Sequence, residues 1–336
     1  MPTILITGGA GYFGSNLVGL LLEQGYAVRV VDRLFFGRDS LVAVLDDPHF
    51  ELLEMDIRNL QPEHFAGVYG VVDLAAISND PSGELDPEAT LSINYQGRAR
   101  VASLARDAGV ERYVLSSSCS VYGFQDEVVS EQSLPNPLTT YAQANVSAES
   151  DILPLARPGF APLVFRFATL YGMSGRMRMD LAVNGMTLGL FRDHSIPVLR
   201  DGTQWRPLLH VQDACAAVLA ALKAPAEAVS GRILNVGSNA QNVRILPLAQ
   251  ELALALDIQF SPAWYGEPDH RSYRVSFDRI EEVLPFRCVL NPQEGARQIA
   301  AALENGTLVV DDSCYTVKTY KRLLSKQPDI LDPPRR

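Results

Sequence analysis

Lysine is nearly absent from this 336-residue chain. Only four lysines occur, and the first of them is Lys223, so residues 1–222 contain none. Chemistry that uses a lysine ammonium or a lysine Schiff base is therefore excluded from that part of the chain, where arginine carries the fixed positive charge. A coding preference for arginine is the simplest explanation of the pattern.

Cysteine clusters, long apolar runs and an excess of positive charge are also missing. The four cysteines form no C-x-x-C or Cys/His spacing, which predicts free thiols in a reducing cytoplasm and no metal site. No apolar run reaches the ~18 residues of a membrane span. The formal net charge of −10 argues against nucleic acid or an anionic membrane as main partner. We expect a cytoplasmic globular protein in which a local arginine cluster can still bind an anionic small ligand.

Short apolar runs alternate with helical patterns through the first half of the chain. The predicted strands are residues 3–7, 27–32, 50–56, 70–76, 112–118 and 162–168, and the predicted helices are 12–26, 88–109 and 141–157. This alternation is typical of an α/β protein with a parallel sheet covered by helices on both faces. Beyond residue 166 we predict a helix over 176–192, a strand followed by a helix capped at Asp213 over 204–224, and a strand over 233–238.

The strongest local signal is "TILITGGAGYFGSNL", in which Gly8, Gly11 and Gly14 follow a strand and open a helix. Glycines at this spacing let the backbone turn tightly and approach a pyrophosphate, which then lies on the helix N-terminus. The motif predicts a Rossmann-type, doubly wound sheet that binds a dinucleotide.

Acidic residues at the ends of the next two strands refine this prediction. Asp32 can accept hydrogen bonds from an adenosine ribose and repel a 2′-phosphate, which favours NAD over NADP, whereas the neighbouring Arg33 weakens the preference. Asp56 suits either a contact with an adenine amine or a helix N-cap.

Two interleaved domains are expected. Residues 1–165 form the NAD-binding domain, to which residues 208–238 return. Residues 166–207 and 239–325 form a smaller α/β domain that binds the substrate, and the proline-rich residues 326–336 form a loose tail.

Several further motifs follow one another in a characteristic order. They are "MDIR", "DLAA", "INYQG", "SSSCSVYG", Tyr141, "RPLLHVQD" and "NVGS", with a weaker match at "PDHRSYRVSFDRI" over 268–280. Together with "TGGAGYFG", this combination resembles the extended short-chain dehydrogenase/reductases, specifically their nucleotide-sugar epimerase/dehydratase branch.

The resemblance implies a role for individual residues. Ser118 becomes the catalytic hydroxyl and Tyr141 the general acid/base, helped by Asn145. The NAD site comprises Gly8, Gly11, Tyr12, Phe13, Gly14, Asp32, Arg33, Asp56, Ile57, Leu74, Ala75, Ala76, Asn94, Tyr141 and Asn145. The substrate, a nucleoside-diphosphate sugar, is bound by Ser78, Ser118, Asn184, Arg206 and Arg271, with Arg176 and Arg178 as weaker candidates. For each arginine a surface salt bridge is the competing interpretation.

Asn145 departs from the family pattern. Members of the family carry a lysine four residues after the tyrosine, where its charge lowers the tyrosine pKa and its amine binds the nicotinamide ribose. An asparagine can still bind the ribose, but it supplies no charge. Three interpretations remain: a slower enzyme, a form altered at this position to trap substrate or cofactor, or a protein that binds a nucleotide sugar without converting it.

The residues after Ser118 narrow the expected chemistry. Sugar dehydratases of this branch carry Asp-Glu there, and this chain carries Cys119 and Ser120, so we do not expect dehydration. Hydride transfer at one sugar carbon remains. We expect an NAD-dependent C4 epimerase that works through a 4-keto intermediate, with a nucleotide-sugar 4-dehydrogenase or 4-ketoreductase as the alternative.

The helices predicted over 88–109 and 141–157 resemble the pair that forms a four-helix dimer interface in this family. The resemblance therefore implies a homodimer.

Overall fold

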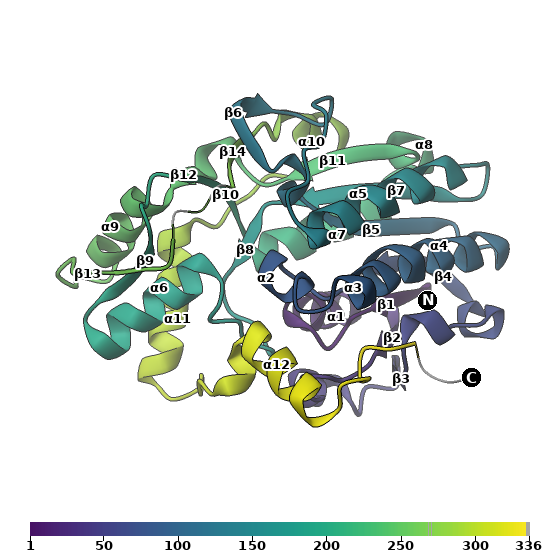
Figure 1. Ribbon diagram of the computed structural model, residues 1–336. Helices are drawn as coiled ribbons and strands as arrows, with labels where there is room; N and C mark the ends of the chain where they lie inside the picture. The colour runs from purple at the N-terminus through teal and green to yellow at the C-terminus, as the bar shows by residue number, and fades with distance from the viewer. Residues whose placement is uncertain (268, 270, 334–336) are drawn as a thin grey trace.

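The computed structural model describes residues 1–267, 269 and 271–333. A seven-stranded parallel sheet forms its centre, in the order β11-β7-β5-β4-β1-β2-β3 (Figure 1). The strands are β1 (Thr3–Thr7), β2 (Ala27–Asp32), β3 (Phe50–Glu54), β4 (Val68–Asp73), β5 (Arg112–Ser118), β7 (Ala161–Phe167) and β11 (Arg232–Val236). The chain winds outward in both directions from β1 and β4. The carboxyl ends of these two strands therefore mark the point where such sheets bind ligands.

Side chains alternate between the two faces of the sheet, and each face has its own apolar core. Ile4 and Ile6 belong to one core, which includes residues of α1 (Tyr12–Glu23) and α7 (Val211–Lys223). Leu5 belongs to the other, with residues of α4 (Arg98–Asp107) and α5 (Thr140–Ile152). Both faces are therefore covered by helices, and the predicted α/β fold class is confirmed. Among the described residues, no helix is long and apolar enough to cross a membrane.

A smaller group of elements lies beside the carboxyl edge of the sheet (Figure 1). A third apolar core joins α6 (Ala182–Asp193), α9 (Ile245–Ala255) and β9 (Ile196–Leu199). Three short sheets also occur. In one, β10 (Trp205–His210) pairs with both β8 (Thr169–Tyr171) and β12 (Asn242–Arg244); the others pair β9 with β13 (Pro262–Tyr265) and β6 (Phe124–Val129) with β14 (Ser272–Val275). The remaining helices are α2 (Asp80–Gly83), α3 (Pro87–Leu91), α8 (Ala226–Val229), α10 (Asp278–Val283), α11 (Pro292–Glu304) and α12 (Thr316–Lys326). The division into two domains stays a prediction.

Three helix predictions need correction. The helix expected over 88–109 is divided into α3, a π-helical segment at Ser92–Gly97, and α4. The helix expected over 176–192 begins only at Ala182, because Arg176 and Arg178 are buried in the preceding segment and donate to Thr316 and Asp180. Helix α7 is capped by His210, whose Nδ1 accepts from the Gln212 amide, and not by Asp213.

The segment expected to be a loose tail is partly docked. Leu331 is buried, and Arg58 donates to the carbonyl oxygens of Leu331 and Asp332 at 2.9 and 3.0 Å. Residues 334–336 of that segment lie outside the described residues.

Helix α5 is fixed to the sheet by a buried ion pair. Arg166 on β7 contacts both carboxylate oxygens of Glu149, the shortest N···O distance being 2.6 Å, and Ser117 on β5 also donates to this carboxylate. Breaking a buried pair from one side leaves an uncompensated charge in the interior, which costs about 3 kcal/mol. Glu149 therefore fixes the helix whose first turn carries Tyr141.

We predict that Glu149→Ala lowers the free energy of unfolding by about 3 kcal/mol, measured by urea denaturation. The matched control is Glu54→Ala, which removes an exposed pair with Arg38 and should change stability by at most about 0.5 kcal/mol. Equal effects of the two substitutions would contradict the assignment.

Candidate active site

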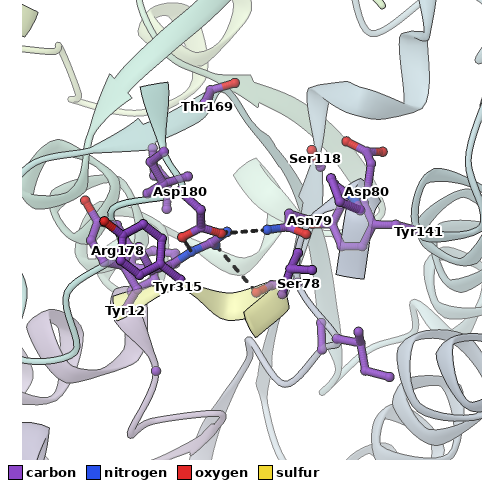
Figure 2. A pocket seen from close by; sticks show the side chains of 18 of the residues that line it. Tyr12, Ser78, Asn79, Asp80, Ser118, Tyr141, Thr169, Arg178, Asp180 and Tyr315 are labelled. Atoms are coloured by element: carbon purple, nitrogen blue, oxygen red, sulfur yellow. Dashed lines mark hydrogen bonds and ion pairs between the residues drawn. The ribbon is translucent and has the colours of Figure 1, made fainter. Parts of the chain in front are cut away.

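A cavity of about 820 Å³ opens at the carboxyl edge of the sheet. Its wall includes the glycine turn after β1, the loops after β2 and β4, the end of β5, the start of α5, and residues of the smaller group of elements. Figure 2 shows the part where Ser118 and Tyr141 face residues of the other side, such as Arg178 and Asp180. The predicted cofactor, substrate and catalytic regions therefore share one space.

The glycine turn requires glycine at two positions. Gly8 has a φ of +71°, and a Cβ built there would lie 2.9 Å from the Ala75 nitrogen. A Cβ on Gly14 would collide with the Gly8 carbonyl oxygen. Gly11 caps α1 without a side chain, so the first amides of the helix stay free to bind an anion.

Tyr12 and Phe13 are both buried beneath this turn. The Tyr12 hydroxyl donates to the Gly172 carbonyl at 2.7 Å, and the Phe13 ring packs edge-on against Phe167 with centroids 5.1 Å apart. These contacts fix the turn against Phe167 at the end of β7 and against Gly172, which follows β8.

Asp32 ends β2 in the cavity wall. Its carboxylate accepts from the amides of Ala10 and Leu34 at 3.0 and 2.8 Å, so it also holds the glycine turn in place. Burial raises the pKa of Asp32, and the hydrogen bonds from these amides oppose the shift. Asp32 lines the cavity, and its contact with an adenosine ribose stays a prediction.

The predicted helix cap at Asp56 is present. Asp56 accepts from the Arg58 amide at 2.8 Å and also contacts the guanidinium groups of Arg58 and Arg33. Burial alone would raise the pKa of Asp56, but these arginine contacts lower it. Asp56 and Ile57 line the cavity, so a contact with adenine stays a prediction.

Leu74, Ala75, Ala76 and Ser78 line the cavity after β4. Asn94 lies behind this loop, fully buried, and its amide bonds both the nitrogen and the oxygen of Ile77 at 2.8 and 3.0 Å. Asn94 is not part of the cavity wall. Asn94 therefore supports the loop that lines the cavity, and its predicted role in the cofactor site stays a prediction.

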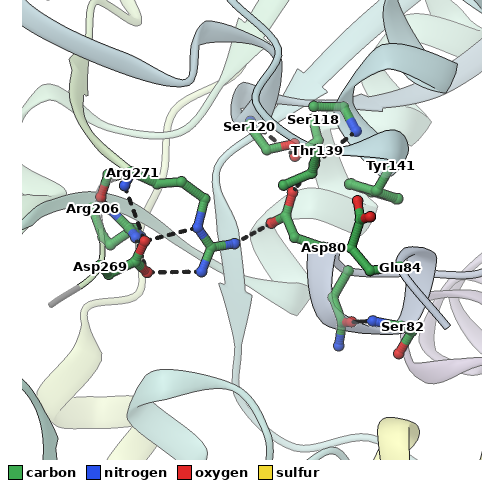
Figure 3. Close-up of polar contacts among 12 residues, drawn as sticks. Asp80, Ser82, Glu84, Ser118, Ser120, Thr139, Tyr141, Arg206, Asp269 and Arg271 are labelled. Atoms are coloured by element: carbon green, nitrogen blue, oxygen red, sulfur yellow. Dashed lines mark hydrogen bonds and ion pairs between the residues drawn. The ribbon is translucent and has the colours of Figure 1, made fainter. Parts of the chain in front are cut away.

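The two predicted catalytic hydroxyls occupy the same side of the cavity (Figures 2 and 3). The Ser118 hydroxyl oxygen accepts from the Ser120 amide at 3.1 Å, and Tyr141 lies in the first turn of α5. Burial raises the pKa of Tyr141, and the nearby carboxylate of Asp80 raises it further. Arg98, Asn145 and Arg178 act in the opposite direction.

Asn145 is fully buried and does not line the cavity. Its Nδ2 donates to the Tyr141 carbonyl at 3.1 Å, and its Oδ1 accepts from Arg98 at 3.1 Å. Both polar atoms of the Asn145 side chain thus bond to the protein, and the predicted contact with a ribose stays a prediction.

Arg206 and Arg271 both reach the cavity wall, as predicted for groups that bind a diphosphate. Each contacts Asp269, at 2.6 and 2.7 Å, and Arg271 also pairs with Asp80 (Figure 3). Pro268 and His270 of this motif lie outside the described residues.

Asn184, predicted to bind the diphosphate, lies behind the cavity wall, and its role stays a prediction. Its side chain is fully buried and lies outside the cavity wall. The amide oxygen accepts from the Gly172 nitrogen, and the two N–H groups donate to the Tyr12 hydroxyl and the Arg178 carbonyl in this structure.

Sequence reasoning missed several residues of the wall. Asp80 accepts from Thr139 at 2.5 Å, and Asp180 contacts both Arg178 and Asn79. Asp80 and Thr139 are 59 positions apart in the sequence, and Asp180 and Asn79 are 101 positions apart. No local motif therefore indicates these contacts.

The two side chains after Ser118 are a buried thiol and a buried hydroxyl. Burial raises the pKa of the Cys119 thiol, whose sulfur donates to the Arg166 carbonyl at 3.3 Å. Ser120 lines the cavity, and its buried hydroxyl has no partner among the described residues. Nowhere among residues 1–267, 269 and 271–333 do three or more His, Cys, Asp or Glu side chains form a cluster suited to a metal.

Helix α12 closes the cavity beside the loop after β2. Tyr320 packs edge-on against Phe36 and Phe35, with ring centroids 5.5 and 6.1 Å apart. Arg176 lies over the Phe36 ring at 3.7 Å and donates to Thr316. An aromatic wall built from distant segments therefore borders the predicted adenosine region.

The glycine turn, the Asp32 carboxylate and the hydroxyls of Ser118 and Tyr141 line one cavity at the carboxyl edge of a Rossmann-type sheet. The profile of the family described as "NAD dependent epimerase/dehydratase family" matches residues 4–237, and the chain belongs to this family. The predicted family and its cofactor, NAD, are thereby confirmed.

Known proteins of several activities are similar to the chain. UDP-glucuronic acid decarboxylase 1 of Arabidopsis thaliana is 27% identical over 92% of this chain and 71% of its own. UDP-glucose 4-epimerase of Mycolicibacterium smegmatis is 28% identical over 90% of this chain and 98% of its own. The solved structure of MoeE5 in complex with UDP-glucuronic acid and NAD has a TM-score of 0.80 and 26% identity, over 90% of this chain and 99% of that one.

We predict that Asp32→Ala weakens NAD binding about tenfold or more, because it removes an anionic acceptor and releases the Ala10 amide. Binding of NADP should weaken less, so the preference for NAD should shrink. Titration calorimetry with both dinucleotides measures this, and Glu54→Ala serves as the control. An unchanged ratio of the two affinities would rule out the ribose role.

The raised pKa of Asp32 predicts a pH dependence of cofactor binding. An ionised carboxylate accepts hydrogen bonds at both oxygens, and protonation removes one acceptor. NAD affinity should therefore be highest at pH values above the pKa of Asp32 and should fall as the pH decreases through this pKa. The fall should occur at a higher pH than the ordinary aspartate pKa of ~3.9. Affinities measured between about pH 4 and 8 should show this fall in the unmodified protein and not in Asp32→Ala.

Proposed function

We propose that the protein is an NAD-dependent nucleotide-sugar C4 epimerase. The observation that carries the proposal is the joint placement of Ser118 and Tyr141 in one cavity with the glycine turn and Asp32. Similarity to a UDP-glucose 4-epimerase over nearly the whole length of both chains supports this assignment.

The residues present suit NAD. The free amides of α1 and the Asp32 carboxylate would hold the pyrophosphate and the adenosine ribose. NAD, when bound, supplies the acceptance and return of a hydride. Arg206 and Arg271 would exchange Asp269 and Asp80 for the diphosphate of the nucleotide sugar.

In the proposed reaction, ionised Tyr141 removes the proton of the sugar C4 hydroxyl while the C4 hydrogen leaves as hydride. Ser118 donates a hydrogen bond to the same oxygen, and a ketone forms at C4. The sugar then presents the other face of the ketone, which takes the hydride back at carbon and the proton from Tyr141 at oxygen. No carboxylic acid follows Ser118, so the mechanism includes no elimination of a hydroxyl.

A 4-dehydrogenase or 4-ketoreductase would use the same residues for half of this cycle. The observation that favours it is the diversity of the relatives, which include a decarboxylase.

We also propose a homodimer, which sedimentation of the purified protein tests directly.

Labelled substrate separates these functions. Purified protein is incubated with a panel of UDP-, GDP-, CDP- and dTDP-sugars, including glucose and glucuronate forms deuterated at C4, and followed by NMR. An epimerase inverts C4, keeps the deuterium there and accumulates no reduced cofactor. Net cofactor reduction indicates a dehydrogenase, and binding without conversion across the panel would contradict both enzymatic assignments.

We predict that Tyr141→Phe lowers kcat roughly 10²–10⁴-fold with little change in the affinity for NAD, because it removes the proton acceptor. Ser118→Ala should lower kcat less, since it removes only a hydrogen bond. Rates come from the NMR assay and affinities from calorimetry. Retained activity in Tyr141→Phe would remove the basis of the mechanism.

A further inference from the structure

The amide of Asn145 has only one possible orientation. A guanidinium can only donate and a peptide carbonyl can only accept. The atom 3.1 Å from Arg98 must therefore be Oδ1, and the atom 3.1 Å from the Tyr141 carbonyl must be Nδ2. Arg98 thus determines which end of the Asn145 side chain faces the helical turn that carries Tyr141.

Arg98 itself is held rigidly. It is 1% exposed, and its guanidinium donates to the Asp73 carboxylate at 3.3 Å, to the Asp73 carbonyl at 3.0 Å and to the Ser116 carbonyl at 2.6 Å. The Nε side faces Asp73, whereas NH1 faces Asn145. The ion pair is therefore a buried dipole whose positive end points toward α5.

We propose that Arg98 is a positioning residue for Tyr141, which orients the Asn145 amide and supplies the positive charge that no lysine provides in this part of the chain. The inference rests on the proposed function, because it assumes that Tyr141 accepts a proton.

The charges around Tyr141 come from several elements. Asp80 lies on α2, and Glu84, which follows that helix, accepts from the Thr140 amide. Arg178 precedes α6, and Arg98 begins α4. Burial and Asp80 raise the pKa of Tyr141, and Arg98 is the largest of the influences that lower it. Asp73 opposes Arg98 in part, but Thr7 and Tyr113 also donate to its carboxylate.

This arrangement excludes a lysine at position 145. A lysine ammonium there would meet the Arg98 guanidinium, which now lies 3.1 Å from the Asn145 oxygen. Like charges in a buried place repel strongly. Arg98 and a lysine at 145 are thus two alternative ways to place a cation beside Tyr141, and they are mutually exclusive.

The first test measures Tyr141 directly, in protein without cofactor or substrate. Protein carrying ¹³Cζ-tyrosine is titrated by NMR, and Tyr141→Phe assigns the resonance. We expect Arg98→Gln to raise the pKa of Tyr141 and Arg98→Lys to raise it less. Arg58→Gln, which removes another buried arginine paired with an aspartate, should leave it unchanged.

Arg98→Gln also leaves Asp73 without its cation, so the variant can fail to fold. The double variant Asp73→Asn/Arg98→Gln removes both charges together. It leaves no unpaired buried charge, so the Tyr141 pKa can be measured even where the single variant does not fold. In this variant the Tyr141 pKa should again exceed that of the unmodified protein. An unchanged pKa in both variants would overturn the proposal.

The second test is a double-mutant cycle with the sugar assay. Asn145→Lys alone should lower stability and give no gain in rate, because Arg98 remains. Arg98→Gln alone should lower the rate at neutral pH roughly tenfold or more, and activity should recover at higher pH. Arg98→Gln/Asn145→Lys should exceed both single variants in rate at neutral pH.

The two readouts separate failure of this inference from failure of the proposed function. If the Arg98 variants raise the Tyr141 pKa but the unmodified protein converts no sugar of the panel, the proposed function is disproved and the role of Arg98 still stands. A large gain of rate in Asn145→Lys with unchanged stability would disprove the role of Arg98 and support the function.

Discussion

The fully buried carboxylate of Asp73, at the end of β4, is the interaction on which the rest of the site depends. One oxygen accepts from Thr7 on β1 at 2.6 Å, and the other accepts from Tyr113 on β5 at 2.6 Å and from Arg98 on α4. Burying an ionised group is costly unless every lone pair finds a partner. The hydrogen bonds to this carboxylate therefore fix β1, β4, β5 and α4 relative to one another. They do so at the point between β1 and β4 where the strand order reverses.

The same set of bonds reaches the cavity. The Thr7 hydroxyl oxygen also accepts from the amides of Leu74 and Ala75 at 3.1 Å, which fixes the loop that the glycine turn approaches. In the other direction, Arg98 connects Asp73 to Asn145 and so to α5. The surfaces proposed for cofactor and for proton transfer are thus held by one buried polar network, in which losing one member affects the others.

Features that depend on neighbours in sequence could be predicted. The strands of the sheet, the glycine turn and the carboxylate of Asp32 follow from patterns a few residues long, and each is found close to its predicted place. The predicted start of α6 is wrong because Arg176 and Arg178 bind Thr316 and Asp180 in the preceding segment. The bonds of the buried Asn184 amide to Tyr12 and Gly172 could not be predicted either, because these partners lie on distant segments.

Arg98 shows why the remaining part of the site could not be predicted. Nothing in the local pattern distinguishes it from Arg100 or Arg106 on the same helix. Its burial results from the π-helical segment at Ser92–Gly97 and from partners on β4, β5 and α5. The asparagine in place of a lysine was visible in the sequence, whereas the arginine beside it required the fold.

The aromatic wall contributed by α12 has a consequence for the order of assembly during synthesis. The glycine turn leaves the ribosome before Tyr320, which packs on Phe35 and Phe36 and follows the turn by more than three hundred residues. A nascent chain can thus form the sheet edge early, but it has no closed adenosine compartment until α12 has folded. Lasting retention of a dinucleotide is consequently expected only after α12 has been synthesised.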